Sequence, residues 1–341
     1  MSEDSGISYS FSASAAAAPQ ELYAFADCEL IPVDPTMMLA INRLNGRQHM
    51  IAPQVVSALK TCTTFRTLEA HADHLAKTRP ELQGNRAPAL QALEQLRDAD
   101  MLLSARSITE KLGDDSENPL APTRAFIITC DRPAAVERLL ESLLQIGTLA
   151  RQDALFLVDD SRRPESRQAN RDAVERFNVR SARTMTYFGA EEQAGLLQRL
   201  VRELPGHERG IRFLLDPAQW TGAKTYGRSR TLCLLLSVGY RAIVMDDDIL
   251  CTAVRAPLEE SGLNFRGRRR ATFYPDPETL MASAVPAEQD PLSSHTEYLG
   301  QQLGRAIPAL NGGPLAQAQL DSCNAAMLNV LDAQSPILVT Q

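Results

Sequence analysis

Apolar runs of strand length alternate with amphipathic stretches after residue 124. Residues 125–130, 154–158 and 242–245 are short, mostly apolar runs that favour β-strands. Between the first two runs, valine and leucine recur at helical intervals after Pro133, at Val136, Leu139, Leu140, Leu143 and Leu144. A strand, a helix and another strand in this order predict a βαβ unit with parallel strands. The expected fold class of residues 124–341 is therefore α/β, a mostly parallel, Rossmann-like sheet with flanking helices.

A different order of elements precedes residue 107. Two strands are expected on either side of Asn45-Gly46, a pair typical of hairpin turns. Helices are expected to begin at Pro53, after a Thr67 cap and near residue 89. Three short helices and a few strands predict a small α+β winged-helix domain in residues 21–106.

Two further segments show no periodic pattern. Residues 1–20 are rich in Ser and Ala, without a positively charged start or a long apolar core, and predict a disordered tail instead of a signal peptide. Residues 107–123 are polar and contain Pro119 and Pro122, which is typical of a linker between domains.

The composition is that of a soluble protein with about two domains. The chain has 341 residues, of which 44% are hydrophobic and 23% charged. The formal charge of -7 argues against a nucleic-acid partner. The six cysteines are scattered singly, as reduced thiols are, and no apolar run is long enough to cross a membrane. We therefore expect a cytoplasmic protein.

Three consecutive carboxylates follow the last strand-like run. Asp246, Asp247 and Asp248 lie between apolar residues 242–245 and Ile249, at the expected carboxyl end of a buried strand. Ligands bind at that edge of open α/β sheets, and buried carboxylates are costly unless a cation holds them. Such oxygen ligands suit Mg²⁺ or Mn²⁺ together with substrate phosphates. The alternative is an acidic turn. The metal hypothesis requires carboxylates that face a cavity open to solvent.

Four segments, in order over about half of the chain, share this pattern of an apolar run with polar residues beside it. They are A-F-I-I-T-C-D-R-P from Ala125, F-L-V-D-D-S-R from Phe156, Y-G-R-S-R-T-L-C-L from Tyr226 and I-V-M-D-D-D-I from Ile243. Together they resemble GT-A glycosyltransferases of the family-2 kind. The resemblance implies a metal-dependent transferase that uses a nucleotide-sugar donor.

The resemblance also implies roles for the polar positions. Four of them would hold the nucleobase and ribose of the donor: Thr129, Asp131, Arg132 and Asp159. Asp246 would face the ribose, and Asp248, then Asp246, would bind the Mn²⁺ or Mg²⁺ ion. Arg228 and Arg230 would lie beside the leaving diphosphate, so that Asp246, Asp248 and Arg230 are the catalytic candidates. Simpler interpretations are a turn at Asp159 and a solvated helix start at the arginines. A run of four arginines is either a solvated loop or a surface for phosphate or acidic peptide: Arg266, Arg268, Arg269 and Arg270.

The segments of the smaller domain resemble the PqqD-like family of peptide-recognition domains. They are M-L-A-I-N-R-L-N-G-R-Q-H-M-I from Met38, F-R-T-L-E-A from Phe65 and L-E-Q-L-R-D-A-D-M-L-L from Leu93. The resemblance implies that a leader peptide adds a strand to the sheet edge beside the third helix, residues 89–99. The alternatives are a domain that only packs on its neighbour, or one that binds DNA, which the acids around Arg97 disfavour.

These segments predict a glycosyltransferase that modifies a ribosomally made peptide held by the amino-terminal domain. The alternatives are a saccharide or lipid-linked glycan acceptor, or a degenerate scaffold that binds peptide without catalysis. The resemblance implies a general base after the segment S-C-N-A-A-M from Ser322. Asp321 and Asp332 are the nearby carboxylates; otherwise the chain is a fragment, the base comes from elsewhere, or the reaction is retaining.

Overall fold

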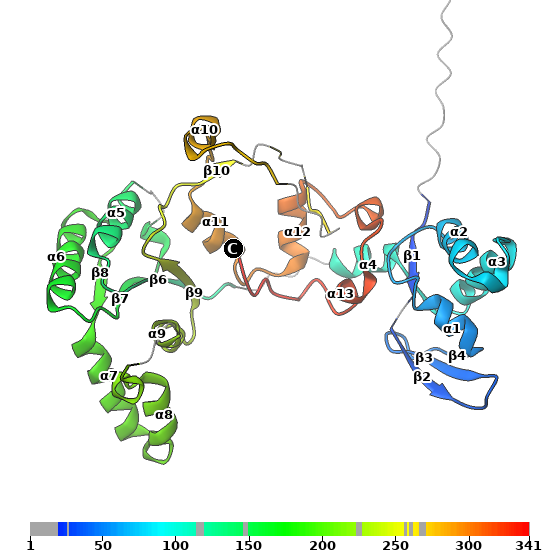
Figure 1. The fold of residues 1–341 in the computed structure, drawn as a ribbon, viewed down its shortest axis with the longest axis horizontal. Helices are drawn as coiled ribbons and strands as arrows, with labels where there is room; N and C mark the ends of the chain where they lie inside the picture. The colour runs from blue at the N-terminus through cyan, green and yellow to red at the C-terminus, as the bar shows by residue number, and fades with distance from the viewer. Residues whose placement is uncertain are drawn as a thin grey trace, which may run out of the picture. The chain divides into compact units, whose positions relative to one another are not determined.

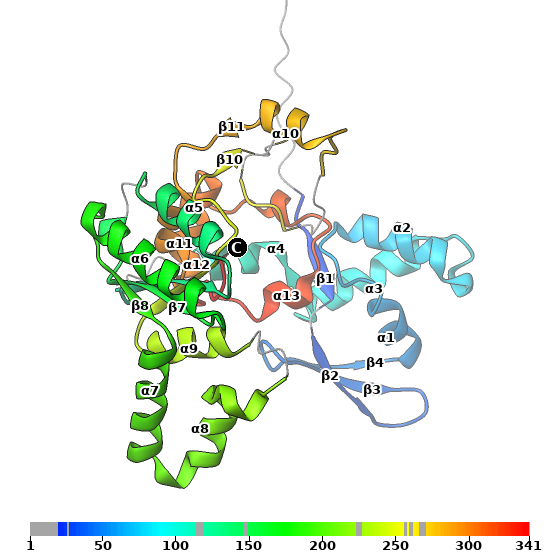
Figure 2. The same ribbon diagram turned by 60° about the vertical axis from the view of Figure 1, so that its left-hand side comes forward.

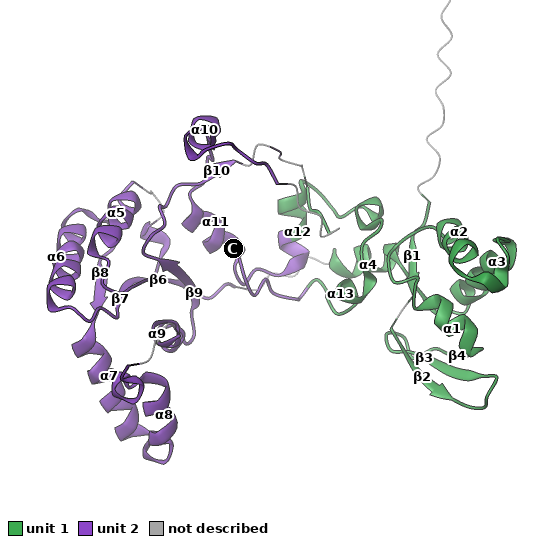
Figure 3. Cartoon of the chain, in the orientation of Figure 1, with its two compact units in different colours: residues 1–115, 262–269, 307–333 green, residues 116–261, 270–306, 334–341 purple. Residues whose placement is uncertain are grey.

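The computed structural model describes residues 20–25, 27–113, 119–145, 149–222, 227–255, 258, 262–265 and 271–340. The chain divides into two compact units (Figure 3). Unit 1 comprises Met1–Asp115, Gly262–Arg269 and Ile307–Ala333, and unit 2 comprises Ser116–Ser261, Arg270–Ala306 and Gln334–Gln341. The expected tail, apart from Gln20, and the arginine run of residues 266–270 lie outside the described residues.

Unit 2 is built on a parallel sheet of four strands (Figure 1). The strands are β6 (Thr123–Thr129), β7 (Ala154–Asp159), β8 (Met185–Phe188) and β9 (Arg241–Asp246), in the spatial order β8-β7-β6-β9. The chain adds β7 and β8 on one side of β6 and then crosses to add β9 on the other side. The strand order therefore reverses between β6 and β9. In open α/β sheets, a crevice for ligands lies at the carboxyl ends of the strands at such a point.

Helices cover both faces of this sheet (Figures 1 and 2). The first face carries α5 (Pro133–Leu143) and α6 (Pro164–Arg180), and the second carries α7 (Ala190–Glu203), α8 (Glu208–Leu215) and α9 (Arg228–Leu236). Side chains of β6 alternate between the two cores: Ala125 and Ile127 pack with α5 and α6, and Phe126 packs with α8 and α9. This confirms the α/β class and explains why the strand runs are almost wholly apolar.

Two elements of unit 2 differ from the sequence-based expectation. The run M-T-Y-F of β8 is short and polar at Thr186, and the apolar pattern does not predict it. The apolar pattern predicts a helix only near residues 169–177, whereas α6 begins at Pro164, because its buried face carries Ser166 and Asn170 as well as apolar residues. A polar buried side chain leaves no trace in an apolar pattern.

The rest of unit 2 consists of short elements. These are η2 (Leu149–Arg151), η3 (Pro205–His207), η4 (Pro217–Trp220), β10 (Val254–Arg255), α10 (Pro277–Ser283), β11 (Val285–Pro286) and α11 (Pro291–Tyr298). Strands β10 and β11 pair with each other in antiparallel fashion. The division between the units falls within α12 (Leu303–Asn311).

Unit 1 holds the strands and helices expected before residue 107. A three-stranded antiparallel sheet has the order β2 (Cys28–Pro32), β3 (Met38–Asn42) and β4 (Gln48–Ile51). It is followed by α1 (Pro53–Leu59), α2 (Leu68–Thr78), η1 (Pro80–Leu82) and α3 (Ala87–Asp98), while β1 (Tyr23–Phe25) pairs with β5 (Leu102–Ser104). The hairpin around Asn45-Gly46 and the Thr67 cap, whose Oγ1 accepts from the N–H of Ala70 at 3.1 Å, are confirmed.

The boundaries of the units differ from the expected ones in two places. Helix α4 (Ala105–Leu112) occupies the start of the expected linker, with Ile108 and Leu112 buried; residues 114–118 lie outside the described residues. Residues 307–333, expected in the α/β domain, belong to unit 1. They contain η5 (Gln317–Leu320) and α13 (Ala325–Asn329).

Backbone hydrogen bonds explain the place of this carboxyl-terminal segment. The N–H of Phe65 donates to the carbonyl of Cys323 at 2.8 Å, and the N–H of Ser322 donates to the carbonyl of Phe65 at 2.7 Å. The N–H of Ala325 donates to the carbonyl of Thr63 at 2.8 Å. The segment thus completes the hydrogen bonding of a strand-like stretch before α2. A local sequence pattern cannot predict such a contact, because the two segments are far apart in the sequence.

Candidate functional site

The polar residues expected at the strand ends lie along one edge of the unit 2 sheet. Thr129 ends β6 and is paired in register with Asp159 at the end of β7. On the other side of β6, Ile128 is paired with Asp246 at the end of β9. Because all four strands are parallel, these residues share the carboxyl edge at the point where the strand order reverses.

The middle carboxylate of the acidic triplet is a buried structural group. Asp247 is 4% exposed. Its Oδ2 accepts from Thr129 Oγ1 at 2.7 Å, and its Oδ1 pairs with Arg132 Nη1 at 2.9 Å. Thr129 therefore binds Asp247, in place of the nucleobase or ribose contact that the resemblance implies. The resemblance implies no role for Asp247, although alternation of neighbouring side chains at a strand end favours opposite directions for Asp247 and its two neighbours.

The outer two carboxylates are open to solvent. The side chains of Asp246 and Asp248 are 56% and 51% exposed. Asp246 pairs with Arg230 at 3.5 Å, and Asp248 pairs with Arg132 at 3.2 Å, and these arginines are themselves at least half exposed. Exposed pairs of this kind contribute little to stability, so each carboxylate can exchange its arginine for another cation.

All three carboxylates line a cavity of about 510 Å³, called here the acidic cavity. Its other lining residues are Ile128, Thr129, Cys130, Asp131, Arg132, Asp160, Arg162 and Ser229. Five aspartates and two arginines give this cavity a formal charge of -3. Asp246 and Asp248 thus line an open cavity, and each is paired there with an exposed arginine.

A divalent cation suits this arrangement as a partner of a ligand. Within the described ranges, no three His, Cys, Asp or Glu side chains come together in a way that would hold a metal ion. Mg²⁺ is commonly held by one or two carboxylates and completes its coordination with water and substrate phosphates. Asp246 and Asp248 can supply those carboxylates, and the excess negative charge of the cavity disfavours a bare diphosphate.

Asp131 ties two loops of the site together. Its φ of 55° lies in the left-handed region, which Asp tolerates better than most residues. Its Oδ1 accepts from the N–H groups of Arg162 and Arg163 at 3.1 and 3.0 Å, and its own N–H donates to Ser161 Oγ at 2.8 Å. Burial alone would raise the pKa of Asp131, but these backbone donors and the Arg163 guanidinium outweigh it and hold the pKa below its usual value.

Asp159 is enclosed by the protein. It is 2% exposed, and it accepts from the N–H of Ser161 at 2.8 Å, from Asn170 Nδ2 at 3.0 Å and from the hydroxyl of Tyr187 at 2.8 Å. Burial, with the neighbouring Asp159 carboxylate, raises the pKa of Tyr187. Asp159 thus organises the end of β7. The next residue, Asp160, lines both the acidic cavity and a second cavity that adjoins it.

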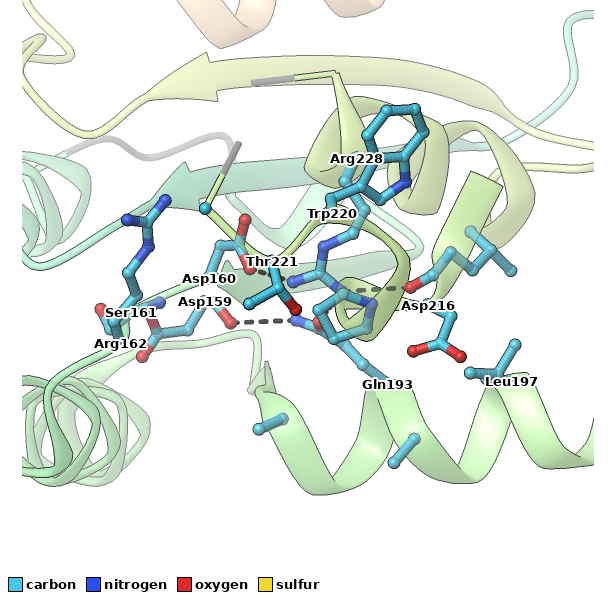
Figure 4. Close-up of a pocket in the computed structure, with 15 residues that line it drawn as sticks. Asp159, Asp160, Ser161, Arg162, Gln193, Leu197, Asp216, Trp220, Thr221 and Arg228 are labelled. Atoms are coloured by element: carbon cyan, nitrogen blue, oxygen red, sulfur yellow. Dashed lines mark hydrogen bonds and ion pairs between the residues drawn. The ribbon is translucent and has the colours of Figure 1, made fainter. Parts of the chain in front are cut away.

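Arg228 is buried at the start of α9 and joins three elements. It is 8% exposed and pairs with Asp160. Its Nη1 donates to Gln193 Oε1 at 2.8 Å, and Gln193 Nε2 donates to the carbonyl of Asp159 at 2.9 Å (Figure 4). Gln193 Nε2 also donates to the carbonyl of Phe188 at 3.1 Å. The interpretation of Arg228 as a solvated helix start is therefore wrong. Arg230, two residues later, is the exposed arginine beside the acidic triplet.

A second cavity, of about 460 Å³, adjoins the acidic cavity and is called here the tryptophan cavity (Figure 4). The two cavities share Asp160 and Arg162. The other lining residues of the tryptophan cavity are Asp159, Ser161, Ala190, Gln193, Ala194, Leu197, Leu215, Asp216, Pro217, Trp220, Thr221, Gly222 and Arg228. The sequence pattern predicts no function for α7, α8 or η4, which supply seven of its fifteen lining residues.

Other positions considered from the sequence lie in unit 1 or outside the described residues. Asp321, Asp332 and the segment from Ser322 belong to unit 1. Tyr226 of the arginine-containing segment is outside the described residues. All six cysteines are free thiols, as expected.

Comparisons of the chain with protein-family models, with curated proteins and with solved structures find no match. None of the helices in the described part of the chain combines the length and the apolar character that crossing a bilayer requires.

Proposed function

We propose that unit 2 is a metal-dependent glycosyltransferase that uses a nucleotide-sugar donor. One observation supports this most strongly. At the point where the strand order of a parallel sheet reverses, Asp246 and Asp248 face an open acidic cavity, across from the loop that follows β6. A ligand site is expected at this place in an α/β sheet. The four segments that resemble family-2 glycosyltransferases converge on it.

The charge of the cavity supports a donor that carries a diphosphate with a divalent cation. Asp246 and Asp248 would hold Mn²⁺ or Mg²⁺, which when bound neutralises charge on a leaving nucleoside diphosphate. Arg132 and Arg230 now pair with these carboxylates. With the cation in place, Arg230 and Nη2 of Arg132 would be free to bind phosphate oxygens, for which the planar guanidinium is suited, while Nη1 of Arg132 stays paired with Asp247.

Calorimetric titration of the whole chain with nucleoside diphosphates tests this proposal. We expect binding in the presence of Mg²⁺ or Mn²⁺, at least a tenfold loss of affinity when the cation is removed, and a similar loss in Asp248→Ala. Glu137→Ala is the matched control, because Glu137 is also a half-exposed carboxylate paired with an arginine, at 3.0 Å, and lines neither cavity. Equal binding by wild type and Asp248→Ala would reject the donor site.

We further propose that unit 1 binds the acceptor as an extended peptide. Its antiparallel sheet ends in the exposed edge strand β2, and an apolar cavity of about 210 Å³ lies among α1, α2 and α3. An extended peptide can pair with an exposed sheet edge, and an apolar cavity can take one of its side chains. Ala92 and Leu93 of α3 line this cavity.

Titration of candidate leader peptides onto the whole chain tests the acceptor. We expect Ala92→Glu, which puts a charge into the apolar cavity, to abolish peptide binding, and Glu94→Ala, at an exposed position on the same helix outside that cavity, to preserve it. Transfer of sugar to a glycan by a chain that binds no peptide would favour the saccharide or lipid-linked acceptor instead.

A further inference from the structure

The tryptophan cavity has an apolar wall on one side. Ala190, Ala194 and Leu197 follow one another at intervals of four and three residues, so they lie on one face of α7. Two of the three side chains are alanines, which leave space beside the helix. Leu215 and Pro217 extend this apolar surface. A flat apolar group would be accepted here at little desolvation cost.

Trp220 is held in a fixed position at this cavity. Its Nε1 donates to the carbonyl of Phe213 at 2.8 Å, and its ring meets the Phe213 ring edge to face, with centroids 4.9 Å apart. The preceding turn is capped by Asp216, which accepts from the N–H of Ala218 at 3.0 Å. Because its N–H is already bonded, the indole offers a ligand its π face and not a hydrogen bond.

The polar floor of the cavity is occupied by bonds within the protein. Gln193 uses its amide for two carbonyls and its Oε1 for Arg228. Arg228 also pairs with Asp160, on the wall shared with the acidic cavity. The tryptophan cavity therefore offers a ligand an aromatic and apolar surface. The excess negative charge lies in the adjoining acidic cavity.

We propose that Trp220 binds the base of the donor, by stacking on it in the tryptophan cavity. This inference rests on the proposed function, because it assigns the second half of the same ligand. A planar base against Trp220 would place its ribose near Asp160 and its diphosphate in the acidic cavity, since the two cavities share that wall. Trp220 lies outside every segment that carries the family resemblance.

Fluorescence gives a direct test, because Trp220 is the only tryptophan of the chain. We expect saturable quenching of its emission by one or more nucleoside diphosphates in Mg²⁺, which unlike Mn²⁺ is not paramagnetic. Inorganic pyrophosphate with Mg²⁺ should bind by calorimetry without changing the emission. Trp220→Ala should lower the affinity for the nucleoside diphosphate about tenfold. Trp220→Phe should lower it by much less, because stacking tolerates another aromatic ring.

Ala194→Leu is a second variant that leaves Trp220 in place. Ala194 is exposed on α7, where leucine is a good helix former, so the fold should be kept while the cavity is filled. We expect this variant to bind the nucleoside diphosphate more weakly and to keep its affinity for pyrophosphate unchanged. If nucleoside diphosphates bind but neither the emission nor the affinity of Trp220→Ala changes, the role of Trp220 is overturned and the proposed function stands. If neither ligand binds, both are overturned.

Discussion

At the scale of single residues, the three consecutive aspartates divide into two kinds. Asp247 is buried between the hydroxyl of Thr129 and the guanidinium of Arg132, whereas Asp246 and Asp248 are half exposed. The fold therefore depends on Asp247, and the proposed ligand binding depends on Asp246 and Asp248. Substitutions can separate the two roles, because the neighbours share the backbone but not the environment.

Asp247→Ala should destabilise the chain by about 3 kcal/mol, since it leaves the buried Thr129 hydroxyl and one face of Arg132 without an acceptor. Asp248→Ala should change the free energy of unfolding by no more than about 0.5 kcal/mol, as exposed substitutions usually do. Urea unfolding followed by circular dichroism measures both. Equal losses in the two variants would contradict the division.

Asp131 makes part of the stability dependent on pH. Because its folded-state pKa is lowered, the stabilisation is present above the ordinary Asp pKa of about 3.9 and is lost as the pH falls through the lower folded value. Asp131→Asn keeps tolerance for the left-handed backbone and removes the charge. We expect the free energy of unfolding of the wild type to exceed that of this variant by about 1 to 2 kcal/mol near pH 7. The difference should vanish in acid. A difference that persists at the lowest pH would contradict this cause.

At the scale of elements, Arg228 connects α9, α7 and the end of β7. One guanidinium bonds both Asp160 and Gln193, and Gln193 in turn bonds the carbonyl of Asp159. This network fixes the wall between the two cavities. A lysine has a single ammonium and cannot reproduce both contacts in their present geometry.

Arg228→Met should therefore lower the free energy of unfolding by about 3 kcal/mol, because it removes the guanidinium that pairs with the largely enclosed carboxylate of Asp160 and bonds Gln193. The free energy of unfolding of Arg228→Lys should lie between those of Arg228→Met and the wild type. Arg230→Met is the control, since Arg230 is 63% exposed and should cost no more than about 0.5 kcal/mol. Thermal unfolding of the three variants under one buffer compares them. A loss in Arg230→Met as large as in Arg228→Met would show that burial is not the cause.

At the scale of the whole molecule, unit 1 is assembled from segments far apart in the sequence. Residues 307–333 return to it, where η5 contacts α4 and residues 322–325 bond the stretch before α2. Leu320, in η5, is fully buried. The amino-terminal residues alone therefore lack part of the core and of the backbone hydrogen bonding of this unit.

A fragment of residues 20–113 should accordingly lack the cooperative unfolding of the whole chain. In the whole chain, Leu320→Ala should destabilise unit 1 by about 2 to 5 kcal/mol, as core truncations of leucine do, and should increase hydrogen exchange in α4. Leu310→Ala, at a 42% exposed leucine of the same unit, is the matched control and should leave that exchange unchanged. Cooperative unfolding of the short fragment, at the stability of the whole chain, would contradict this assembly.

Much of the candidate site followed from local pattern. The positions of β6, β7 and β9, the helix opened by Pro133 and the acidic residues at the strand ends were predicted because periodicity and strand length report local burial. The identity of the edge was also predictable, since parallel strands bring their carboxyl ends together. Strand β8 was missed because it is short and interrupted by the exposed Thr186, and the start of α6 was missed because Ser166 and Asn170 fill buried positions there.

The sequence by itself determined most of the elements, their parallel pairing and the gathering of acidic residues at one edge of a sheet. Only the tertiary structure decided that Asp247 and Asp159 are enclosed, that Arg228 is buried while Arg230 is exposed, that Trp220 faces a cavity beside the acidic one, and that residues 307–333 complete unit 1. The reason is physical. Burial and hydrogen-bond partners of a polar side chain depend on residues distant in sequence, and a local pattern carries no information about them.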